Sequence, residues 1–249
     1  MAPLARAPAL MRPSSPPRRP CERHAMTFPG DDPSRRARRG WRPDESAVDS
    51  GAPVFTMLSV CTGNICRSPM AEQLLRASLA DVISAAGTPL FAFASAGVAT
   101  RDGYPMDPIS ARFSAQHGGD PSNHLSAVLS EAFVGEADLM LTMTRDHLID
   151  ASRRFPSVLL RGFTLLEFAR VMPFVLREVP LPTLEDPVAR LRAVVRLAAA
   201  HRGRAPRSES GDDIEDPIGR SEATHERVAA QIAAAVADIS RDLRALARR

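Results

Sequence analysis

Two cysteines, an arginine and a serine are concentrated in one short stretch of the chain, VCTGNICRSPMAEQLL at residues 60–75. Cys61 follows an apolar run and precedes a helix expected from about Ser68, so it lies at a strand-to-helix junction. The dipole and the free backbone N–H groups of a helix N-terminus stabilise a thiolate, and the thiolate is the nucleophilic form of cysteine. The pattern predicts that Cys61 is a reactive nucleophile rather than a buried structural thiol.

The residues that follow Cys61 favour the binding of a phosphate-sized anion. Gly63 and Asn64 tolerate left-handed backbone angles, so successive N–H groups can turn inward and form an anion-binding nest. The planar fork of Arg67 can hold two oxygens of a phosphoryl group at its pentacoordinate stage, and Ser68 can donate its hydroxyl to the Cys61 sulfur. The residues predicted to bind substrate are Thr62, Gly63, Asn64, Ile65, Cys66 and Ser68.

Phosphoryl transfer to a thiolate also needs a proton donor for the leaving oxygen, and an aspartate on another loop would serve. The segment DDIEDPIGR at 212–220 contains Asp216, which Pro217 biases toward an extended backbone. Asp212 and Asp213 are competing candidates. Asp186 also precedes a proline, but it opens an expected helix and is better interpreted as its N-cap. The predicted catalytic residues are Cys61, Arg67 and Asp216, and no metal or cofactor is required.

The stretch VCTGNICRSPMAE resembles the signature loop of the low-molecular-weight protein tyrosine phosphatases. The segment SAGVATRDGYPMDP and the late EDP match other landmarks of that family in order, over roughly residues 56–246. The resemblance implies a four-stranded parallel sheet, with Cys61 as nucleophile, Arg67 as phosphate binder and Asp216 as general acid.

The same resemblance implies roles for three further residues. Asn64 and Ser95 would brace the loop by hydrogen bonds. Cys66 would form a reversible disulfide with Cys61 under oxidant, which would protect the nucleophile from over-oxidation. A role for Cys66 as a small core residue is the alternative.

The function expected is a cysteine-dependent phosphatase that hydrolyses phosphomonoesters, of the protein tyrosine phosphatase type, through a phosphocysteine intermediate. The substrate would be a phosphorylated protein or a small phosphoester. Ile218, Gly219 and Arg101 occupy positions where family members that act on phosphotyrosine carry aromatic walls, so a weakened preference for phosphotyrosine is expected. The alternatives are an arsenate reductase that uses a small-thiol partner, and a non-catalytic anion-binding module.

The elements that would position these residues alternate between strands and helices. Strands are expected at 54–60, 90–97, 137–144 and 157–163, and helices from about Ser68, at 108–117 and at 221–247. This alternation predicts an α/β fold: a four-stranded parallel sheet with helices on both faces and the phosphate-binding loop after the first strand. Between the fourth strand and the last helix, 172–211 is expected to be an inserted helical segment that ends in a mobile linker and can cover the cleft.

Composition sets the remaining expectations. The Arg- and Pro-rich residues 1–53 are predicted to be a disordered tail, with Met26 and Met57 as alternative starts, and 54–249 the phosphatase domain. The tail holds ten Arg and six Asp or Glu, a net of +4, which leaves 22 basic and 23 acidic residues, a net of −1, in the remainder, so no nucleic-acid partner is expected. No apolar run is long enough for a bilayer, and no secretory signal is visible, which predicts a cytoplasmic protein without membrane contact.

His117 and His124 lack supporting ligands for a metal. Cys21 in the tail is expected to be inert. No pattern in the sequence specifies an oligomeric state.

Overall fold

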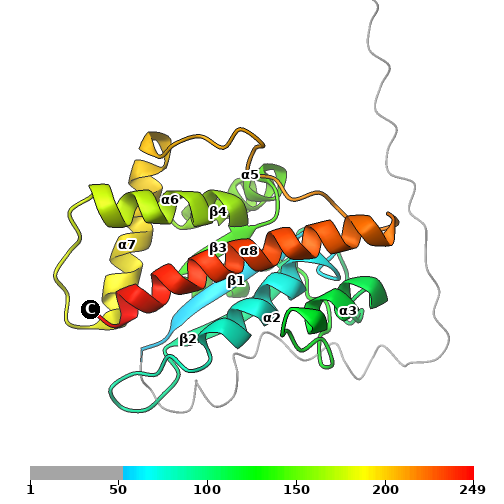
Figure 1. The fold of residues 1–249 in the computed structure, drawn as a ribbon, viewed down its shortest axis with the longest axis horizontal. Coiled ribbons are helices and arrows are strands. Elements are labelled where there is room, and N and C mark those ends of the chain that lie inside the picture. The colour runs from blue at the N-terminus through cyan, green and yellow to red at the C-terminus, as the bar shows by residue number, and fades with distance from the viewer. Residues whose placement is uncertain (1–52) are drawn as a thin grey trace, which may run out of the picture. The chain divides into compact units, whose positions relative to one another are not determined.

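The computed structural model describes residues 53–249, and its centre is a sheet of four parallel strands (Figure 1). The strands are β1 (Phe55–Cys61), β2 (Phe91–Gly97), β3 (Leu139–Thr142) and β4 (Gly162–Thr164), in the order β2-β1-β3-β4. Cys61 is in register with Gly97, and Val60 with Thr142, so the carboxyl ends of the three longer strands meet at one edge. The predicted fold class is confirmed.

Alternate side chains of the strands point into two apolar clusters, as the period of a strand requires. Phe55, Met57 and Cys61 of β1 lie in the larger cluster, whereas Leu58 and Val60 lie in the smaller one. Helices α2 (Arg67–Leu79), α3 (Pro108–Gln116), α6 (Leu165–Glu178), α7 (Pro187–His201) and α8 (Glu222–Ala247) contribute to the larger cluster. Helices α4 (Glu131–Glu136) and α5 (Arg145–Arg154), with the 3₁₀ turn η2 (Pro156–Leu160), enclose the smaller one. The sheet is therefore covered on both faces.

The last helix matches its prediction closely. It was expected at 221–247, and its apolar residues at spacings of three and four form a buried stripe: Val228, Ile232, Val236, Ile239 and Leu243. Helix α8 runs across the sheet with α2 and α6 beside it (Figure 1), and it contacts both of these helices. This packing holds α2, whose first two residues are Arg67 and Ser68.

The prediction of a fourth strand at 157–163 is wrong for most of its length. Residues 156–160 form η2, and β4 begins only at Gly162. Leu159 and Leu160 are 59% and 68% exposed, so the apolar run does not mark a buried strand. A Cβ at Gly162 would lie 2.5 Å from Val158 Cγ1, which explains why the chain passes from the turn into the sheet at a glycine. The third strand is also shorter than expected, at Leu139–Thr142.

Helix α6 begins at Leu165, before the helical segment that was expected near 172–211. Thr164 and Glu167 form a capping box at its N-terminus, a signal that is present in the sequence as TLLE. Helix α7 begins as expected, because Asp186 caps it by accepting from two backbone N–H groups. Val188 and Leu191 are among its buried residues.

Helix α7 does not cover the cleft, contrary to expectation. Arg192 in this helix donates to the carbonyl oxygen of Val54, just before β1, and forms an ion pair of 2.7 Å with Asp138, just before β3. These contacts lie at the amino ends of the strands, whereas Cys61 lies at the carboxyl end of β1. Helix α7 therefore braces the amino-terminal ends of the strands, at the end of the sheet away from the cysteine loop.

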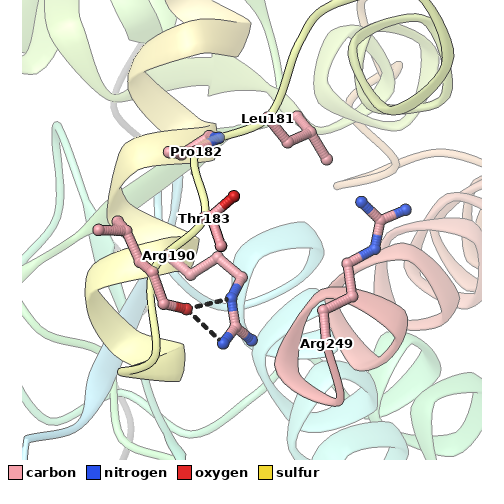
Figure 2. Close-up of a pocket in the computed structure, with 6 residues that line it drawn as sticks. Leu181, Pro182, Thr183, Arg190 and Arg249 are labelled. Atoms are coloured by element: carbon pink, nitrogen blue, oxygen red, sulfur yellow. Dashed lines mark hydrogen bonds between the residues drawn. The ribbon is translucent and has the colours of Figure 1, made fainter.

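A pocket of about 180 Å³ lies where the loop before α7 faces the end of α8 (Figure 2). It is lined by Leu181, Pro182, Thr183, Leu184, Arg190 and Arg249. The buried guanidinium of Arg190 donates to the carbonyl oxygens of Leu184 and Leu246, so it serves to fasten α7 to the last turn of α8. None of the predicted site residues lines this pocket.

The predicted tail, 1–53, lies outside the described residues except for Pro53. The linker expected at 202–211 contains the short 3₁₀ turn η3 (Arg202–Arg204), and it is fastened to the body of the protein. Arg202 donates to the carbonyl oxygen of Gly162, and Arg170 donates to that of Pro206. Across residues 53–249, no helix is both long enough and apolar enough to cross a membrane.

Candidate active site

The loop between β1 and α2 has its carbonyl oxygens turned outward. The carbonyls of Thr62 and Ile65 accept from the backbone N–H groups of Ala99 and Asp107, at 3.0 and 2.8 Å. The carbonyl of Gly63 accepts from the hydroxyl of Thr100 at 2.8 Å. Because the C=O and the following N–H of a peptide point in opposite directions, the N–H groups that follow these carbonyls face the inside of the loop. The loop is therefore a cradle of backbone donors, suited to an anion.

Asn64 holds the cradle in shape from within. It has a φ of 54°, the left-handed conformation that asparagine tolerates, and it is fully buried. Its amide nitrogen donates to the hydroxyls of Ser68 at 3.0 Å and Ser95 at 2.9 Å, while its amide oxygen accepts from the backbone N–H of Ala127 at 2.8 Å. Glu72 of α2 accepts from the Ser95 hydroxyl at 2.6 Å. The structure thus connects the two predicted bracing residues, Asn64 and Ser95, directly.

The sulfur of Cys61 lies at the bottom of this loop and faces donors. The backbone N–H of Asn64 points to Sγ at 3.2 Å, and the hydroxyl oxygen of Ser68 lies 3.0 Å from it. The Ser68 oxygen accepts from Asn64, and its hydrogen has two acceptors within reach, the sulfur at 3.0 Å and the carbonyl oxygen of Ala96 at 3.4 Å, of which the sulfur is the nearer. The Cys61 sulfur thus contacts one backbone N–H group and one hydroxyl group.

Arg67 is the first residue of α2, and its buried guanidinium connects the cradle to the loop after residue 211. Nη1 donates to the carbonyl oxygen of Ile214 at 3.0 Å, and Nη2 lies 2.5 Å from the Asp216 carboxylate. The third nitrogen, Nε, is buried and has no hydrogen-bond partner among the described residues. A buried donor without a partner is costly, so an anion in the cradle would relieve it.

The three aspartates that were candidates for the proton donor have different partners in the structure. Only Asp216 contacts Arg67. Asp212 forms an ion pair with Arg170, and Asp213 accepts from the backbone N–H of Arg145. The carboxylate of Asp216 also accepts from the backbone N–H of Ile218 at 3.2 Å, which holds the Asp-Pro turn.

Sequence reasoning missed His147, which lies in the first turn of α5 and is buried. Its Nε2 lies 2.8 Å from the Thr62 hydroxyl, so α5 supports the first residue of the loop after Cys61. Burial, reinforced by the positive charge of Arg67, lowers the pKa of His147 to about 4. The imidazole is therefore neutral at pH 7. The sequence offered no motif for it, since its contact spans two distant segments.

His124 is a second supporting histidine. Its Nε2 lies 2.7 Å from the carbonyl oxygen of Asn64, and burial lowers the pKa of this imidazole below its ordinary value. It had been considered only as a metal ligand together with His117. Within residues 53–249, no group of three or more His, Cys, Asp or Glu side chains is placed to hold a metal ion.

Cys66, the second cysteine of the loop, is buried as a free thiol at the N-cap of α2. Burial, with a smaller effect from the negative charge of Asp107, raises its pKa to about 12, against the opposing hydrogen bond of Ser110. Cys66 is thus a protonated thiol at neutral pH, and its environment differs from that of Cys61.

A protein-family model covers the loop that contains Cys61 and Arg67. The sequence model described as "Low molecular weight phosphotyrosine protein phosphatase" matches residues 56–197. The chain is 42% identical over 104 residues to the probable low molecular weight protein-tyrosine-phosphatase EpsP of Ralstonia solanacearum, a match covering 42% of this chain and 66% of that protein. It is 36% identical over 111 residues to Etp of Escherichia coli K12, covering 45% of this chain and 68% of that protein. The match thus spans just under two thirds of the Ralstonia relative.

Solved structures share the fold. The low molecular weight protein tyrosine phosphatase from T. tengcongensis aligns with a TM-score of 0.52 and 25% identity, over 74% of this chain and 97% of that one. A YwlE mutant from Bacillus subtilis aligns with a TM-score of 0.54 and 22% identity, over 76% of this chain and 98% of that one. With the loop geometry described above, the matched family model leads to one conclusion: the chain belongs to the low molecular weight phosphotyrosine protein phosphatase family.

Proposed function

We propose that the chain hydrolyses phosphomonoesters in two steps through a phosphocysteine intermediate. The observation that supports this most strongly is the convergence of the Cys61 sulfur, the Arg67 guanidinium and the Asp216 carboxyl group at the carboxyl edge of the sheet. These groups supply a nucleophile, an anion binder and a proton donor, which are the parts that phosphoryl transfer to a thiol requires.

In the first step the Cys61 thiolate attacks phosphorus, and the bond between phosphorus and the ester oxygen breaks. The leaving oxygen takes the proton of the Asp216 carboxylic acid. Arg67 and the inward-facing N–H groups of the cradle hold the phosphoryl oxygens while charge builds on them. The products of this step are an alcohol or phenol, and a phosphoryl group bonded to sulfur.

In the second step water attacks the phosphocysteine, and the Asp216 carboxylate accepts its proton. The sulfur–phosphorus bond breaks, and both its electrons return to sulfur. The Asn64 N–H, which points to Sγ, and the Ser68 hydroxyl, whose oxygen lies 3.0 Å from Sγ, stabilise the departing thiolate. Inorganic phosphate leaves, and the starting enzyme is regenerated.

The test is hydrolysis of p-nitrophenyl phosphate, combined with rapid acid quenching and mass spectrometry of the cysteine peptide. We expect turnover and one phosphoryl group on Cys61, with both absent in Cys61→Ser. The matched control is Cys21→Ser, which removes a cysteine outside the described residues and should keep wild-type activity. Full activity of Cys61→Ser would refute the covalent mechanism, and binding of phosphate without turnover would favour a non-catalytic anion-binding module.

The comparisons do not favour the arsenate reductase alternative, because the curated relatives reported above are named as protein-tyrosine-phosphatases. The sequence also has no cysteine after Cys66 that could resolve an arsenic adduct within the chain. An assay of arsenate reduction with a small thiol distinguishes the two reactions, and we expect no turnover in it.

The proposed substrate is a phosphorylated protein or a small phosphoester, with only a weak preference for phosphotyrosine. Ile218 is exposed beside the Asp-Pro turn, and Gly219 adopts a φ of 68°. Arg101 is exposed next to Thr100, whose hydroxyl bonds the loop carbonyl of Gly63. These three positions provide no aromatic wall, so stacking of about 0.5–1.5 kcal/mol per ring is lost. The kcat/KM values for phosphotyrosine and phosphoserine peptides test this preference. A phosphoarginine peptide is included because one solved neighbour is an arginine phosphatase, YwlE from Geobacillus stearothermophilus.

We also propose that the protein works in the cytoplasm, without a nucleic-acid partner. The proposed chemistry requires a reduced Cys61, and cytoplasmic reductants maintain thiols in that state. Fractionation of cells that express the full chain, followed by immunodetection, tests the location.

A further inference from the structure

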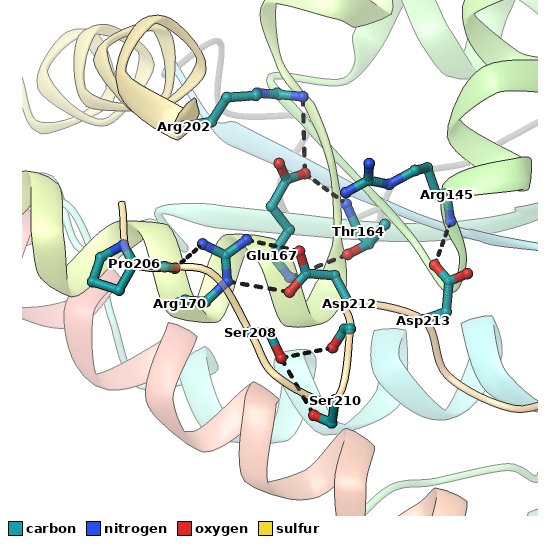
Figure 3. Close-up of polar contacts among 11 residues, drawn as sticks. Arg145, Thr164, Glu167, Arg170, Arg202, Pro206, Ser208, Ser210, Asp212 and Asp213 are labelled. Carbon is teal, nitrogen blue, oxygen red and sulfur yellow. Dashed lines mark hydrogen bonds and ion pairs between the residues drawn. The ribbon is translucent and has the colours of Figure 1, made fainter. Parts of the chain in front are cut away.

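The segment that leads into the Asp216 loop is fastened to α6 by one arginine (Figure 3). The Arg170 guanidinium grips the Asp212 carboxylate with two nitrogens, Nε to Oδ1 at 3.2 Å and Nη2 to Oδ2 at 2.7 Å. Its remaining nitrogen donates to the carbonyl oxygen of Pro206 at 2.5 Å. A single side chain therefore holds both ends of 206–212, and the Asp212 side chain is only 8% exposed.

The next two residues are attached to two other elements. The Asp213 carboxylate accepts from the backbone N–H of Arg145 at the start of α5, at 2.7 Å. Ile214 is fully buried, and its N–H donates to the carbonyl oxygen of Met143 just beyond β3, at 2.9 Å. Three consecutive residues thus contact α6, α5 and the end of β3, and we call this arrangement the 212–214 clamp.

The clamp is adjacent to the proposed catalytic groups. The carbonyl oxygen of Ile214, its last residue, accepts from Arg67, and Asp216 follows two residues later. Asp216 itself has a side chain that is 43% exposed, so packing gives it little support. An exposed loop residue keeps a fixed position only if the chain beside it is ordered, because loop ordering costs conformational entropy.

We propose that Arg170 and Asp212 are positioning residues, which hold Asp216 against the leaving group and Arg67 against the phosphoryl group. The inference rests on the function proposed above. A bidentate arginine–carboxylate pair fixes direction as well as distance, which a single ion contact does not. The reason to expect a catalytic effect is that a misplacement of about 1 Å can cost about 10²-fold in rate.

The test compares two esters that differ in their need for a proton. p-Nitrophenolate leaves readily as an anion, whereas phenol has a pKa near 10 and leaves slowly without protonation. In Arg170→Ala, the kcat/KM for phenyl phosphate should fall about tenfold more than that for p-nitrophenyl phosphate, since general-acid catalysis contributes roughly 10²–10⁴-fold. Asp212→Asn should shift the ratio in the same direction, and the double variant should shift it no further than Arg170→Ala, because the two residues act as one unit.

The matched control is Arg192→Ala. Arg192 forms a bidentate pair of the same chemistry with Asp138, but this pair lies at the amino-terminal ends of the strands, away from Cys61. This variant should lower the thermal midpoint without changing the ratio of the two kcat/KM values. If Arg170→Ala does not fold, the same ratio of kcat/KM values is measured in Asp212→Asn and Arg170→Lys. These variants disturb the pair less, and the ratio should shift in the same direction by a smaller factor. An active wild type whose clamp variants keep the wild-type ratio would contradict the positioning role alone, whereas an inactive wild type would contradict the proposed function as well.

Discussion

The Arg67 guanidinium and the Asp216 carboxylate are in direct contact, with Nη2 and Oδ2 separated by 2.5 Å. The arginine is buried, whereas the aspartate faces solvent with nearly half of its side chain. The carboxylate therefore engages a nitrogen that a phosphoryl oxygen would also use. Binding of a phosphate group requires that Arg67 exchange this ion pair for contacts with the ligand.

The first prediction follows from this exchange. Asp216→Asn should bind inorganic phosphate more tightly, because the neutral amide competes less well for the guanidinium. A partly exposed ion pair is worth up to about 1 kcal/mol, which corresponds to an inhibition constant lowered about two- to fivefold. The inhibition constant is measured from competitive inhibition of the residual activity by inorganic phosphate. The kcat of the variant should fall, because Asp216 no longer supplies a proton. Weaker inhibition in the variant would show that the carboxylate assists anion binding instead.

The second prediction concerns Asn64, whose side chain bonds Ser68, Ser95 and the backbone of Ala127 at once. Asn64→Ala removes these bonds and also places alanine at a φ of 54°. Asn64→Gly removes the same bonds without that backbone strain, which costs roughly 1–2 kcal/mol. Chemical denaturation should therefore find Asn64→Ala less stable than Asn64→Gly by about 1 kcal/mol, with both well below wild type. Equal stability of the two variants would mean that the loop relaxes to another backbone conformation.

Most of the site residues that could be found from sequence carry a signal in their immediate neighbours in the chain. Cys61, Arg67 and Ser68 occupy one strand-to-helix junction, where spacing alone defines the chemistry. The proline after Asp216 distinguished that residue from its neighbours, and the structure agrees in giving it alone the contact with Arg67. The sheet was also predictable, because three of its strands are buried runs flanked by turns.

The missed features depend on contacts between distant segments. His147 and Thr62 are joined across 85 positions, and nothing in either local sequence indicates the partner. The run at 157–163 was interpreted as a strand because it is apolar, but apolar runs of that length do not distinguish a strand from a turn with exposed leucines. The capping box of α6, in contrast, was visible as TLLE and could have moved the predicted start of the inserted segment.

The third prediction concerns Gly97, opposite Cys61 in the sheet. A Cβ at this position would lie 2.7 Å from the carbonyl oxygen of Thr62 and 2.8 Å from Thr100 Cγ2. Gly97→Ala must therefore displace the loop, and a shift of about 1 Å can lower kcat/KM by about 10²-fold. The control is Gly135→Ala in α4, where an added Cβ meets nothing within 4 Å. That variant should keep wild-type activity, and loss of activity in both would point to a general sensitivity to alanine.

The fourth prediction tests the disulfide expected between Cys61 and Cys66. Hydrogen peroxide would oxidise the Cys61 thiolate to a sulfenic acid and be reduced to hydroxide. The Cys66 thiolate would then attack the Cys61 sulfur, form the disulfide and displace hydroxide, which takes a proton from solvent and leaves as water. Because the pKa of Cys66 is raised to about 12, this second step should accelerate as pH rises from 7 to 9. Activity regained with dithiothreitol after peroxide should be high in wild type, higher at the upper pH, and low in Cys66→Ser. Equal recovery in the variant would exclude the protective disulfide.

The fifth prediction concerns the acid stability of the fold. The pKa of His147 is lowered from 6.5 to about 4 in the folded protein. Between these values the unfolded chain binds a proton that the folded one does not, so stability is complete above pH 6.5 and falls as the pH approaches 4. The loss from this group alone is about 3 kcal/mol. His147→Gln keeps a nitrogen near the Thr62 hydroxyl but does not titrate. The difference in unfolding free energy between wild type and His147→Gln should therefore shrink or reverse from pH 7 to pH 4, whereas a constant difference would mean that the imidazole is protonated without cost.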